Sequence, residues 1–291
     1  MADATSLGIA VVDKEAGWTS HDVVARGRKV FGTRKVGHSG TLDPGATGVL
    51  LLGVGRATRL LRFLTALPKT YTTTVVLGTE TSTLDDSGEV TVTHDMTAVT
   101  EPQITAAVGQ FVGDILQVPP MVSALKIDGR RLHELAREGI EVEREARPVT
   151  IHDLAVTSVD PAAGTFGIEV TCSSGTYVRT LAADIGAALD GGAHLRDLRR
   201  TAIGSFDQAE ARPIDDAVLI SPAEGLRDYP AVVATDELAP AVGHGKVLTR
   251  ELLGLDDGGG PWRIVDSTGE LLAMYEPHRG DTVKPAVVLV G

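Results

Sequence analysis

The chain has 291 residues, of which 43% are hydrophobic, and its net charge is −12. This composition supports a folded core, and the acidic balance argues against a general polyanion binder. The single cysteine, Cys172, excludes an internal disulfide and a multi-cysteine zinc site. Because no apolar run reaches transmembrane length and the N-terminus lacks a signal-peptide pattern, we expect a soluble cytoplasmic protein without a membrane contact.

The charge is distributed unevenly along the chain. Residues 1–75 contain ten Lys and Arg against five Asp and Glu, whereas residues 205–291 contain seven against fifteen. Attraction to phosphate is local, because salt screens exposed charges beyond about 10 Å. A basic N-terminal face on an acidic protein is therefore compatible with RNA binding, and the acidic remainder keeps non-specific binding weak.

The first predicted elements are a short strand and a capped helix. Residues 9–13 predict the strand, and Thr19 with Asp22 three residues later is typical of a capping box. Valines supply the buried stripe of the helix that follows. A basic cluster begins in this helix and continues just beyond it, with Arg26, Arg28, Lys29, Arg34 and Lys35.

The most informative segment is Gly-His-Ser-Gly-Thr-Leu-Asp-Pro-Gly-Ala-Thr-Gly at residues 37–48. It places one acid, Asp43, among glycines, threonines and a proline, with no second carboxylate for five residues on either side. Pro44 pushes Asp43 toward an extended backbone, and the glycines permit close approach by another molecule. The apolar run at residues 49–54 predicts a buried strand, so we expect Asp43 on a fixed loop beside the sheet. Taken alone, Asp-Pro-Gly is more often an ordinary turn.

Residues 57–67 predict a helix after this strand. Arg56, Arg59 and Arg62 are spaced three apart and share one face, while leucines occupy another. Taken alone, such a row favours a solvated helix face. Its position directly after the Asp43 loop makes it a candidate track for RNA phosphates, and Lys69 is a further candidate for contact with the RNA backbone.

Strands and helices alternate through the middle of the chain. Residues 69–77 predict a strand with Tyr71 on one side, residues 149–159 and 165–172 predict two more strands, and a helix begins near Val178. An aromatic side chain on a half-buried strand most simply serves packing, and the strand pattern alone gives Tyr71 that role.

Two segments differ from this pattern. Residues 118–147 contain a Pro-Pro pair, a short helical stretch and alternating charges. Beyond about residue 205, prolines and glycines separate short apolar runs, which predicts a small β domain that starts near residue 229.

Several motifs together resemble those of the TruB family, the bacterial tRNA pseudouridine-55 synthases. Gly-Thr-Leu-Asp-Pro at residues 40–44 is similar to the catalytic motif of that family. The further motifs, in the family's order, are Asp13-Lys14 with Gly17-Trp18-Thr19-Ser20, Lys69-Thr70-Tyr71 with Leu77-Gly78, Ser174-Gly175-Thr176-Tyr177-Val178-Arg179-Thr180, and Gly192-Ala193-His194-Leu195 with Leu198-Arg199-Arg200-Thr201. One departure is Glu15, where the family usually has proline.

The resemblance implies a mixed α/β (α+β) fold with a largely antiparallel sheet. Residues 1–228 would form the catalytic domain, with residues 118–147 as a thumb-like insertion over the RNA. Residues 229–291 would form a small C-terminal β domain of the PUA-like type. The charges of the insertion are balanced, so we expect a movable flap more than an electrostatic clamp.

The resemblance also implies the reaction. The enzyme would isomerise uridine-55 in the T arm of tRNA to pseudouridine, after the base leaves its stack. Asp43 would be the catalytic residue, either as a nucleophile toward the sugar or base or as a base that abstracts a proton. Because the reaction needs neither a redox change nor external energy, no cofactor and no metal are expected.

The remaining site residues are carried over from the matched motifs. Arg179 stands at the start of a predicted helix, where the macrodipole disfavours a cation, and the resemblance implies that Asp43 is its buried acid partner. Tyr71 would stack on the flipped base, and Tyr177 and Leu198 would be walls of the uracil pocket.

His38 belongs to the same carried-over set. It would enter the space that the flipped base vacates. Alternatively, it is a loop histidine that binds backbone.

Two readings from other classes remain. A nucleotide-binding protein could use the loop at residues 37–48 as a phosphate cradle, but the Walker lysine is missing and Asp43 would repel phosphate. A non-catalytic RNA-folding chaperone could use the same scaffold, yet Asp43, Tyr71 and Arg179 are all present, and the two activities could coexist. We expect a monomeric enzyme that takes tRNA as its partner and requires no protein partner.

Overall fold

The computed structural model describes residues 6–123, 125–127, 129–255 and 258–289. The chain divides into two compact units. The first unit consists of Met1–Pro44, Gly48–Ala66 and Ile203–Gly291, and the second consists of Gly45–Thr47 and Leu67–Ala202. Within the described ranges, no helix is both long enough and apolar enough to cross a membrane.

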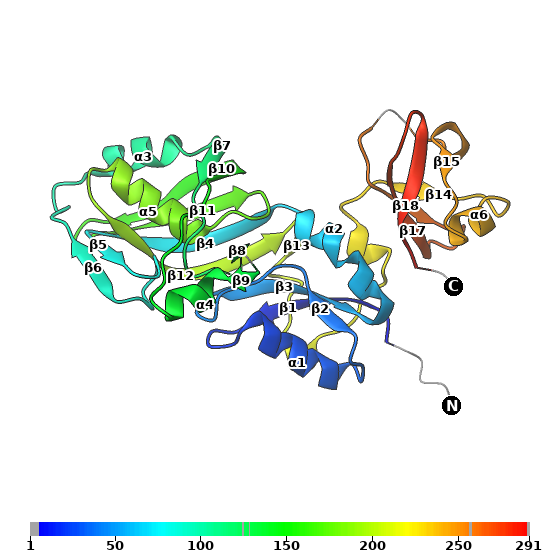
Figure 1. Cartoon of the computed structure of the whole chain (residues 1–291), viewed down its shortest axis with the longest axis horizontal. Coiled ribbons are helices and arrows are strands. Elements are labelled where there is room, and N and C mark those ends of the chain that lie inside the picture. The colour runs from blue at the N-terminus through cyan, green and yellow to red at the C-terminus, as the bar shows by residue number, and fades with distance from the viewer. Residues whose placement is uncertain (1–5, 124, 128, 256–257, 290–291) are drawn as a thin grey trace. The chain divides into compact units, whose positions relative to one another are not determined.

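The N-terminal part of the first unit contains three antiparallel strands and one helix against them. Strand β1 (Gly8–Lys14) pairs antiparallel with β3 (Thr47–Val54), and the short β2 (Val36–His38) also pairs antiparallel with β3. Figure 1 shows helix α1 (Ser20–Val30) beside these strands. The buried side chains between helix and sheet are Ala10, Val12, Val23, Val24, Val36, Leu50, Leu52 and Val54.

Helix α1 begins with the predicted capping box. The Thr19 side chain accepts a hydrogen bond from the backbone N–H of Asp22, and the Asp22 carboxylate accepts one from the backbone N–H of Thr19. These two bonds satisfy N–H groups that would otherwise lack a partner in the first turn. The sequence therefore predicted both the start of this helix and the reason for it.

The segment after β3 differs from the predicted single helix. A 3₁₀ helix, η1 (Gly55–Leu60), precedes a short α-helix, α2 (Leu61–Ala66). Gly55 has a positive φ of 64°, which a side chain would disfavour. A 3₁₀ helix has three residues per turn, so the arginines spaced three apart in η1 lie nearly above one another. The prediction of a shared face thus holds, although the first turn is not α-helical.

The second unit is organised around a sheet in which β4 (Lys69–Leu77) lies between β12 (Ala193–Ile203) and β11 (Thr165–Cys172). The sheet continues from β11 through β10 (Arg147–Asp160) to β7 (Gly113–Gln117). The pairs β4–β11, β11–β10 and β10–β7 are all antiparallel. The predicted mixed α/β fold with a largely antiparallel sheet is confirmed.

Helices α3 and α5 complete this unit. Helix α3 (Glu101–Gly109) starts with a capping box between Thr100 and Gln103 and contacts β10. Helix α5 (Val178–Ala188) starts directly after Tyr177 and contacts α3. Two strands form a separate hairpin-like pair, β5 (Thr79–Thr81) and β6 (Val90–Thr93).

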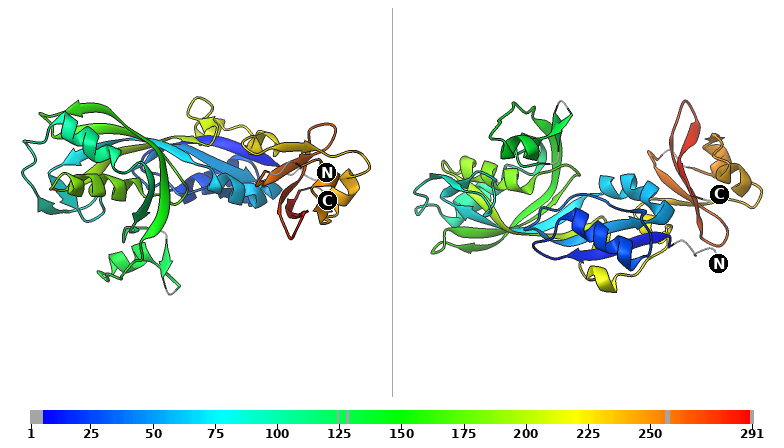
Figure 2. Two further views of the ribbon diagram at one scale, coloured as in Figure 1. Left: turned by 90° about the horizontal axis from the view of Figure 1, so that it is seen from above. Right: turned by 60° about the horizontal axis from the view of Figure 1, so that its bottom comes forward.

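The segment at residues 118–147 contains helix α4 (Leu132–Arg137) and the short pair of strands β8 (Lys126–Ile127) and β9 (Arg130–Arg131). In the left view of Figure 2 this green segment extends away from the sheet of its own unit. Positions 124 and 128 of the segment lie outside the described residues. Its predicted role as a thumb over RNA stays a prediction.

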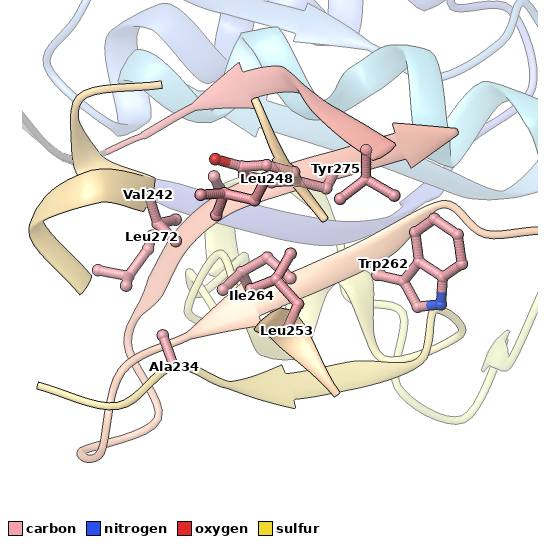
Figure 3. Packing of buried hydrophobic residues seen from close by; sticks show 10 residues of the cluster. Ala234, Val242, Leu248, Leu253, Trp262, Ile264, Leu272 and Tyr275 are labelled. Atoms are coloured by element: carbon pink, nitrogen blue, oxygen red, sulfur yellow. The ribbon is translucent and has the colours of Figure 1, made fainter. Parts of the chain in front are cut away.

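The C-terminal part of the first unit is a second sheet in the order β14–β16–β17–β18–β15. Its strands are β14 (Ala231–Val233), β15 (Leu248–Thr249), β16 (Trp262–Val265), β17 (Leu271–Pro277) and β18 (Thr282–Val288). Figure 3 shows its core, where Trp262, Ile264 and Tyr275 pack with Leu248 and Leu272. Short helices connect the strands and the segment before them: η2 (Ile214–Asp216), η3 (Glu224–Leu226), α6 (Ala239–Gly243) and η4 (Glu251–Leu253). A small β domain is therefore present where it was predicted; its boundary at residue 229 and its PUA-like character stay predictions.

Candidate active site

Asp43 lies on an irregular loop between β2 and β3, as the sequence predicted, and it is half-buried. The residues on both sides of it are fixed by hydrogen bonds from the segment at the start of α1. The Ser20 hydroxyl accepts a bond of 2.9 Å from the backbone N–H of Leu42 and donates one of 3.2 Å to its carbonyl. The carbonyl of Pro44 accepts a bond of 2.9 Å from the backbone N–H of Gly17. The backbone at Asp43 is thus fixed by hydrogen bonds to the residues on either side of it, Leu42 and Pro44.

A buried lysine adds a third fixing point to this loop. Lys14 is only 1% exposed, and its ammonium donates to the carbonyls of Glu15, Trp18 and Pro44 over 2.9, 2.7 and 3.3 Å. A buried ammonium is costly unless its N–H groups find acceptors, and here three carbonyls supply them. The sequence singled out Lys14 only as part of a motif, and its anchoring role was not foreseen. Glu15, the departure from the family pattern, contributes one of the three carbonyls.

His38 occupies the last position of β2 and is half-buried. Its Nδ1 accepts a hydrogen bond of 3.3 Å from the backbone N–H of Gly40. The ring of His21 meets it edge to face, with 5.4 Å between the ring centroids. The alternative role of His38 as a loop histidine that binds backbone is therefore present in this structure, and its proposed contact with the substrate stays a prediction.

In the second unit, Tyr71 lies on β4, where burial alternates along the strand. Its side chain is on the buried side, with 8% of the residue exposed, and it pairs in register with Val170 of β11. The strand therefore fixes the position of the Tyr71 ring. Its predicted stacking on the flipped base is untested.

Arg179 is 5% exposed in the first turn of α5. Its guanidinium donates to the carbonyls of Thr83 and Val122 over 2.9 Å each, and it lies 3.5 Å from the carboxylate of Asp85. The predicted need of this cation for a buried acid is met within the unit by Asp85, which the sequence analysis did not single out. The pairing of Arg179 with Asp43, which belongs to the other unit, stays a proposal.

Asp85 is itself held in a tight turn. Its Oδ1 accepts hydrogen bonds from the hydroxyls of Thr83 and Ser87 at 2.5 Å each and from the backbone N–H of Ser87 at 3.1 Å. These three hydrogen bonds fix the position of the Asp85 carboxylate beside Arg179. The Thr-Leu-Asp-Asp-Ser sequence at residues 83–87 could have indicated such a turn, because Thr, Asp and Ser bond their own backbone in turns.

Tyr177 and Leu198 occupy different elements of the second unit. Tyr177 is half-buried at the N-cap of α5, and its backbone N–H and carbonyl both bond the side chain of Gln117, at 2.7 and 3.1 Å. Leu198 is half-buried on β12. Gln117 is 2% exposed and was also missed by the sequence analysis. The predicted uracil pocket formed by Tyr177 and Leu198 is untested.

The predicted phosphate track is engaged with the C-terminal sheet. Arg56 donates to the carbonyl of Leu289 and Arg59 donates to that of Val288, the latter over 2.7 Å. Arg62 forms an ion pair of 2.9 Å with Glu276. These arginines are therefore not merely a solvated helix face, the alternative that their spacing first favoured. Their contact with RNA stays a proposal.

Lys69, the fourth candidate for backbone contact, is buried on β4 and donates to the carbonyl of Leu67 over 2.6 Å. Burial, and secondarily the nearby charge of Arg200, lowers the pKa of Lys69 to about 8. This ammonium is not at the surface in the structure, so a direct phosphate contact would require it to move. Among the described residues, no three His, Cys, Asp or Glu side chains are grouped as they would be to hold a metal ion.

Comparison with known proteins shows the family of this chain. Residues 28–178 match the model of the TruB family pseudouridylate synthase N-terminal domain, and residues 179–226 match that of the tRNA pseudouridylate synthase B C-terminal domain. Relatives named tRNA pseudouridine synthase B include one from Corynebacterium aurimucosum, which is 46% identical over 92% of each chain. Another, from Mycobacterium ulcerans, is 44% identical over 97% of this chain and 94% of its own.

A solved structure gives the same picture for the fold. The crystal structure of a Cbf5-Nop10-Gar1 complex matches with a TM-score of 0.76 and 26% identity, over 98% of this chain and 85% of the matched chain. The resemblance stated from the sequence motifs is therefore confirmed. The chain belongs to the TruB family of pseudouridylate synthases.

Proposed function

We propose that this chain is a tRNA pseudouridine synthase that isomerises uridine-55 in the T arm, with Asp43 as the catalytic residue. The observation that carries the proposal is the Asp43 loop: the aspartate of a Gly-Thr-Leu-Asp-Pro motif stands between two residues that are clamped to a neighbouring segment. The names of the relatives, tRNA pseudouridine synthase B, supply the class of reaction and the class of substrate.

The chemistry suits a fixed carboxylate. The bond between N1 of uracil and C1′ of the ribose breaks, the base turns, and a new bond joins C5 to C1′. The proton on C5 is lost and N1 gains one, so product and substrate have the same composition. Asp43 can act as the nucleophile or as the base that takes the C5 proton, and both roles require a carboxylate held at one position.

The polar groups of the second unit support the proposal through their arrangement. Arg179 has a planar guanidinium that matches a carboxylate, and its present partners leave its position well defined. With Tyr71 and Tyr177 of the same unit, it would form the part of the site that receives the flipped uracil. Unstacking the base costs a few kcal/mol, which contacts of this kind must offset.

We further propose that the enzyme acts alone, as a cytoplasmic monomer that recognises the folded T arm by shape and backbone. RNA loops present splayed bases and phosphates, which proteins read in this way. The matched Cbf5 structure is a complex with Nop10 and Gar1. Relatives of 44–46% identity that match over more than 90% of both chains are the better guide to this chain.

The experiment that tests the function uses the purified protein and an unmodified T-arm hairpin. Pseudouridine is detected by carbodiimide labelling and primer extension, with a hairpin that carries cytidine at the target position as the negative control. We expect one pseudouridine at the position equivalent to uridine-55. Modification of full-length tRNA but not of the hairpin, or modification only when other proteins or a guide RNA are added, would contradict the stand-alone mechanism.

A further inference from the structure

The segment between the start of α1 and the catalytic loop is unusually basic. Residues 23–42 contain five Lys and Arg and no Asp or Glu, in a chain whose net charge is −12. One of the five, Arg26, is neutralised by an ion pair with Asp215. We call the other four the α1–β2 cation patch, which consists of Arg28, Lys29, Arg34 and Lys35.

All four side chains of the patch are exposed. Within the part of the chain that the structure describes, none of them forms an ion pair, a side-chain hydrogen bond or a contact with an aromatic ring. This distinguishes them from Arg56, Arg59 and Arg62, each of which donates to the C-terminal part of the chain. Uncompensated, exposed cations that are clustered within eight residues of the chain are candidates for binding a polyanion.

The backbone that carries the patch is firmly held. At the end of α1 the N–H of Phe31 bonds the carbonyl of Gly27 over 2.9 Å, and the N–H of Thr33 bonds the carbonyl of Arg28 over 3.1 Å. Gly32 between them has a positive φ of 63°, as this type of helix ending requires. The carbonyl of Lys35 accepts a bond of 2.7 Å from Gly55. The patch is therefore a preformed surface.

The distance between the patch and the catalytic loop follows from α1 itself. Ser20, the first residue of α1, is bonded to Leu42 beside Asp43, and Arg28 and Lys29 lie in the last turn. The helix has 11 residues, which correspond to about 16 Å at 1.5 Å per residue. The patch thus lies about one helix length from the group that must reach the target nucleotide, too far to contact the phosphates of that nucleotide.

We propose that the α1–β2 cation patch binds backbone phosphates of the substrate RNA in the duplex stem that carries the target loop. This inference rests on the proposed function, since it assigns a second contact region to the same substrate. Double-stranded RNA is recognised mainly through its shape and its phosphates, and exposed cations on a firmly held backbone supply what such recognition needs. The patch strengthens binding without taking part in the chemical step.

A structural role accounts for only part of the patch. Arg28 and Lys29 stand in the last turn of α1, where cations interact favourably with the helix dipole. Arg34 and Lys35 lie beyond the helix, where that explanation does not apply. Loss of helix stability and loss of RNA binding can therefore be separated by changing the two residues outside the helix.

The test compares two variants of equal charge change. The patch variant is Arg28→Gln with Arg34→Gln and Lys35→Gln. The control variant is Arg212→Gln with Lys246→Gln and Arg279→Gln, which removes two exposed arginines and one exposed lysine elsewhere in the first unit. Affinity for full-length unmodified tRNA and for a hairpin with a shortened stem is measured between 50 and 200 mM KCl. The rate at saturating enzyme is measured in parallel.

For full-length tRNA we expect the patch variant to reduce the slope of log Kd against log salt by about two to three units, since each phosphate contact contributes about 0.7–0.9. Affinity at the lower salt should fall at least ten-fold, on the order expected for two to three lost contacts. The control should stay close to wild type, the rate at saturation should not change, and the shortened hairpin should show a smaller effect. A second variant, Arg34→Gln with Lys35→Gln, keeps the test valid if the triple variant folds poorly.

The outcomes separate this inference from the proposed function. Slopes and affinities of the patch variants that equal those of the control on both RNAs would overturn the inference, and a docking site for an acidic protein would produce that result. A patch-dependent slope together with no pseudouridine formed by the wild-type protein would support the phosphate contact and overturn the proposed function.

Discussion

The Asp43 loop of the first unit and the start of α5 in the second unit each contain a contact with a buried cation, and the hydrogen bonds of the two cations differ in their range along the sequence. Lys14 donates to three carbonyls, those of Glu15, Trp18 and Pro44. Arg179 donates to two carbonyls and also lies beside the carboxylate of Asp85. Two of the three Lys14 acceptors lie within four residues of it in the sequence, whereas the acceptors of Arg179 are 57 or more residues away.

This difference suggests different roles for the two cations. Lys14 has a structural role, because its hydrogen bonds connect the carbonyls of Glu15 and Trp18 to that of Pro44, the residue after Asp43. Arg179 belongs to a charge pair, so a change in its partner alters the electrostatics of the surrounding site as well as its geometry. We therefore expect changes at Lys14 to appear first in stability, and changes at Arg179 to appear first in turnover.

The largest effect is expected for Asp43→Asn, because this change removes the carboxylate that is proposed to perform the chemistry. The amide keeps the shape of the side chain but loses its charge and its nucleophilicity. Pseudouridine formation should fall to background, a loss of at least about 1,000-fold for a residue that performs the chemistry. Binding to tRNA should persist or improve slightly, because phosphate contacts come from cations elsewhere.

Two measurements side by side check this prediction: the yield of pseudouridine and the affinity for tRNA. Thermal unfolding serves as the control for folding, and it should change little because Asp43 is only half-buried. Retained turnover in Asp43→Asn would remove Asp43 from the mechanism. Loss of tRNA binding together with activity would instead show that the variant lost more than the chemistry.

The second effect concerns the charge pair of Arg179 and Asp85. Arg179→Lys replaces a planar fork by a point charge that cannot hold two carbonyls and a carboxylate in one geometry. Single-turnover rates should fall by about 10- to 100-fold, equivalent to roughly 1.4–2.7 kcal/mol in the barrier. Asp85→Asn should produce a defect that overlaps with it, because residues of one network are not additive.

A double-mutant cycle of Arg179→Lys and Asp85→Asn measures that overlap. The double variant should be little worse than the poorer single variant. If the two rate losses multiply, Arg179 and Asp85 act independently, and the charge pair is not a functional unit. Affinity for tRNA should be similar in all three variants, which distinguishes a defect in turnover from one in binding.

The third effect tests the structural role of Lys14. Lys14→Met keeps much of the volume but removes three hydrogen bonds from a charged donor, and a hydrogen bond to a charged group contributes about 1.5–3 kcal/mol. Relief from burying the ammonium offsets part of this, so we expect a loss of roughly 2–4 kcal/mol in the free energy of unfolding. Chemical denaturation measures this loss, with the exposed Lys246→Met as the control that should change stability by less than about 0.5 kcal/mol.

A fourth effect depends on pH and concerns Lys69. Its folded pKa of about 8 lies below the ordinary value of 10.5, so between these values the unfolded chain binds more protons than the folded one. Stability therefore rises with pH across this window. From pH 7.5 to 9 the rise from Lys69 should be about 1 kcal/mol.

Lys69→Met should lack this rise, and the difference between wild type and variant isolates it. The comparison is needed because burial raises the pKa of Cys172 to about 11, and a raised pKa of an acid makes stability fall as the pH increases above the ordinary value. Cys172 is present in both proteins. Urea unfolding at the two pH values gives the answer, and equal pH dependence in both proteins would mean that the Lys69 ammonium is not buried.

Much of the fold and part of the site followed from local sequence. The capping box at Thr19, the β4 alternation and the Asp43 loop before a buried strand all rest on residues close together in the chain. The partners of Arg179 could not be predicted in this way. Val122 and Asp85 are 57 and 94 positions from Arg179, and only tertiary structure brings them together.

The arginines after β3 show the same limit. Their spacing predicted a shared face, because periodicity is a local property. What that face contacts is not local: the partners of Arg59 and Arg62 are at positions 288 and 276. A row of cations therefore has the same appearance in the sequence whether it binds phosphate or its own chain. Lys14 illustrates the converse, since its position in a motif was recognisable but its three carbonyl partners were not.

The smallest effect is expected where cations are already engaged. Arg56, Arg59 and Arg62 donate to Leu289, Val288 and Glu276, whereas the cations of the α1–β2 patch have no such partners within the described residues. Arg59 and Arg62 remain partly exposed and keep other N–H groups, so one phosphate contact is compatible with their geometry. A triple Arg→Gln variant should reduce the salt slope of tRNA binding by less than about one unit, compared with two to three units for the patch variant.

This last comparison is measured with the same tRNA and the same salt series. A slope change for the arginine triple that equals or exceeds that of the patch variant would mean that the contacts to the C-terminal strands open when RNA binds. An unchanged slope would assign the three arginines entirely to holding the C-terminal sheet. Thermal unfolding separates these cases further, because loss of hydrogen bonds to Val288 and Leu289 and of the ion pair to Glu276 should lower the melting temperature without RNA. Exposed pairs contribute little individually, about 0–1 kcal/mol, so the expected change is a few degrees.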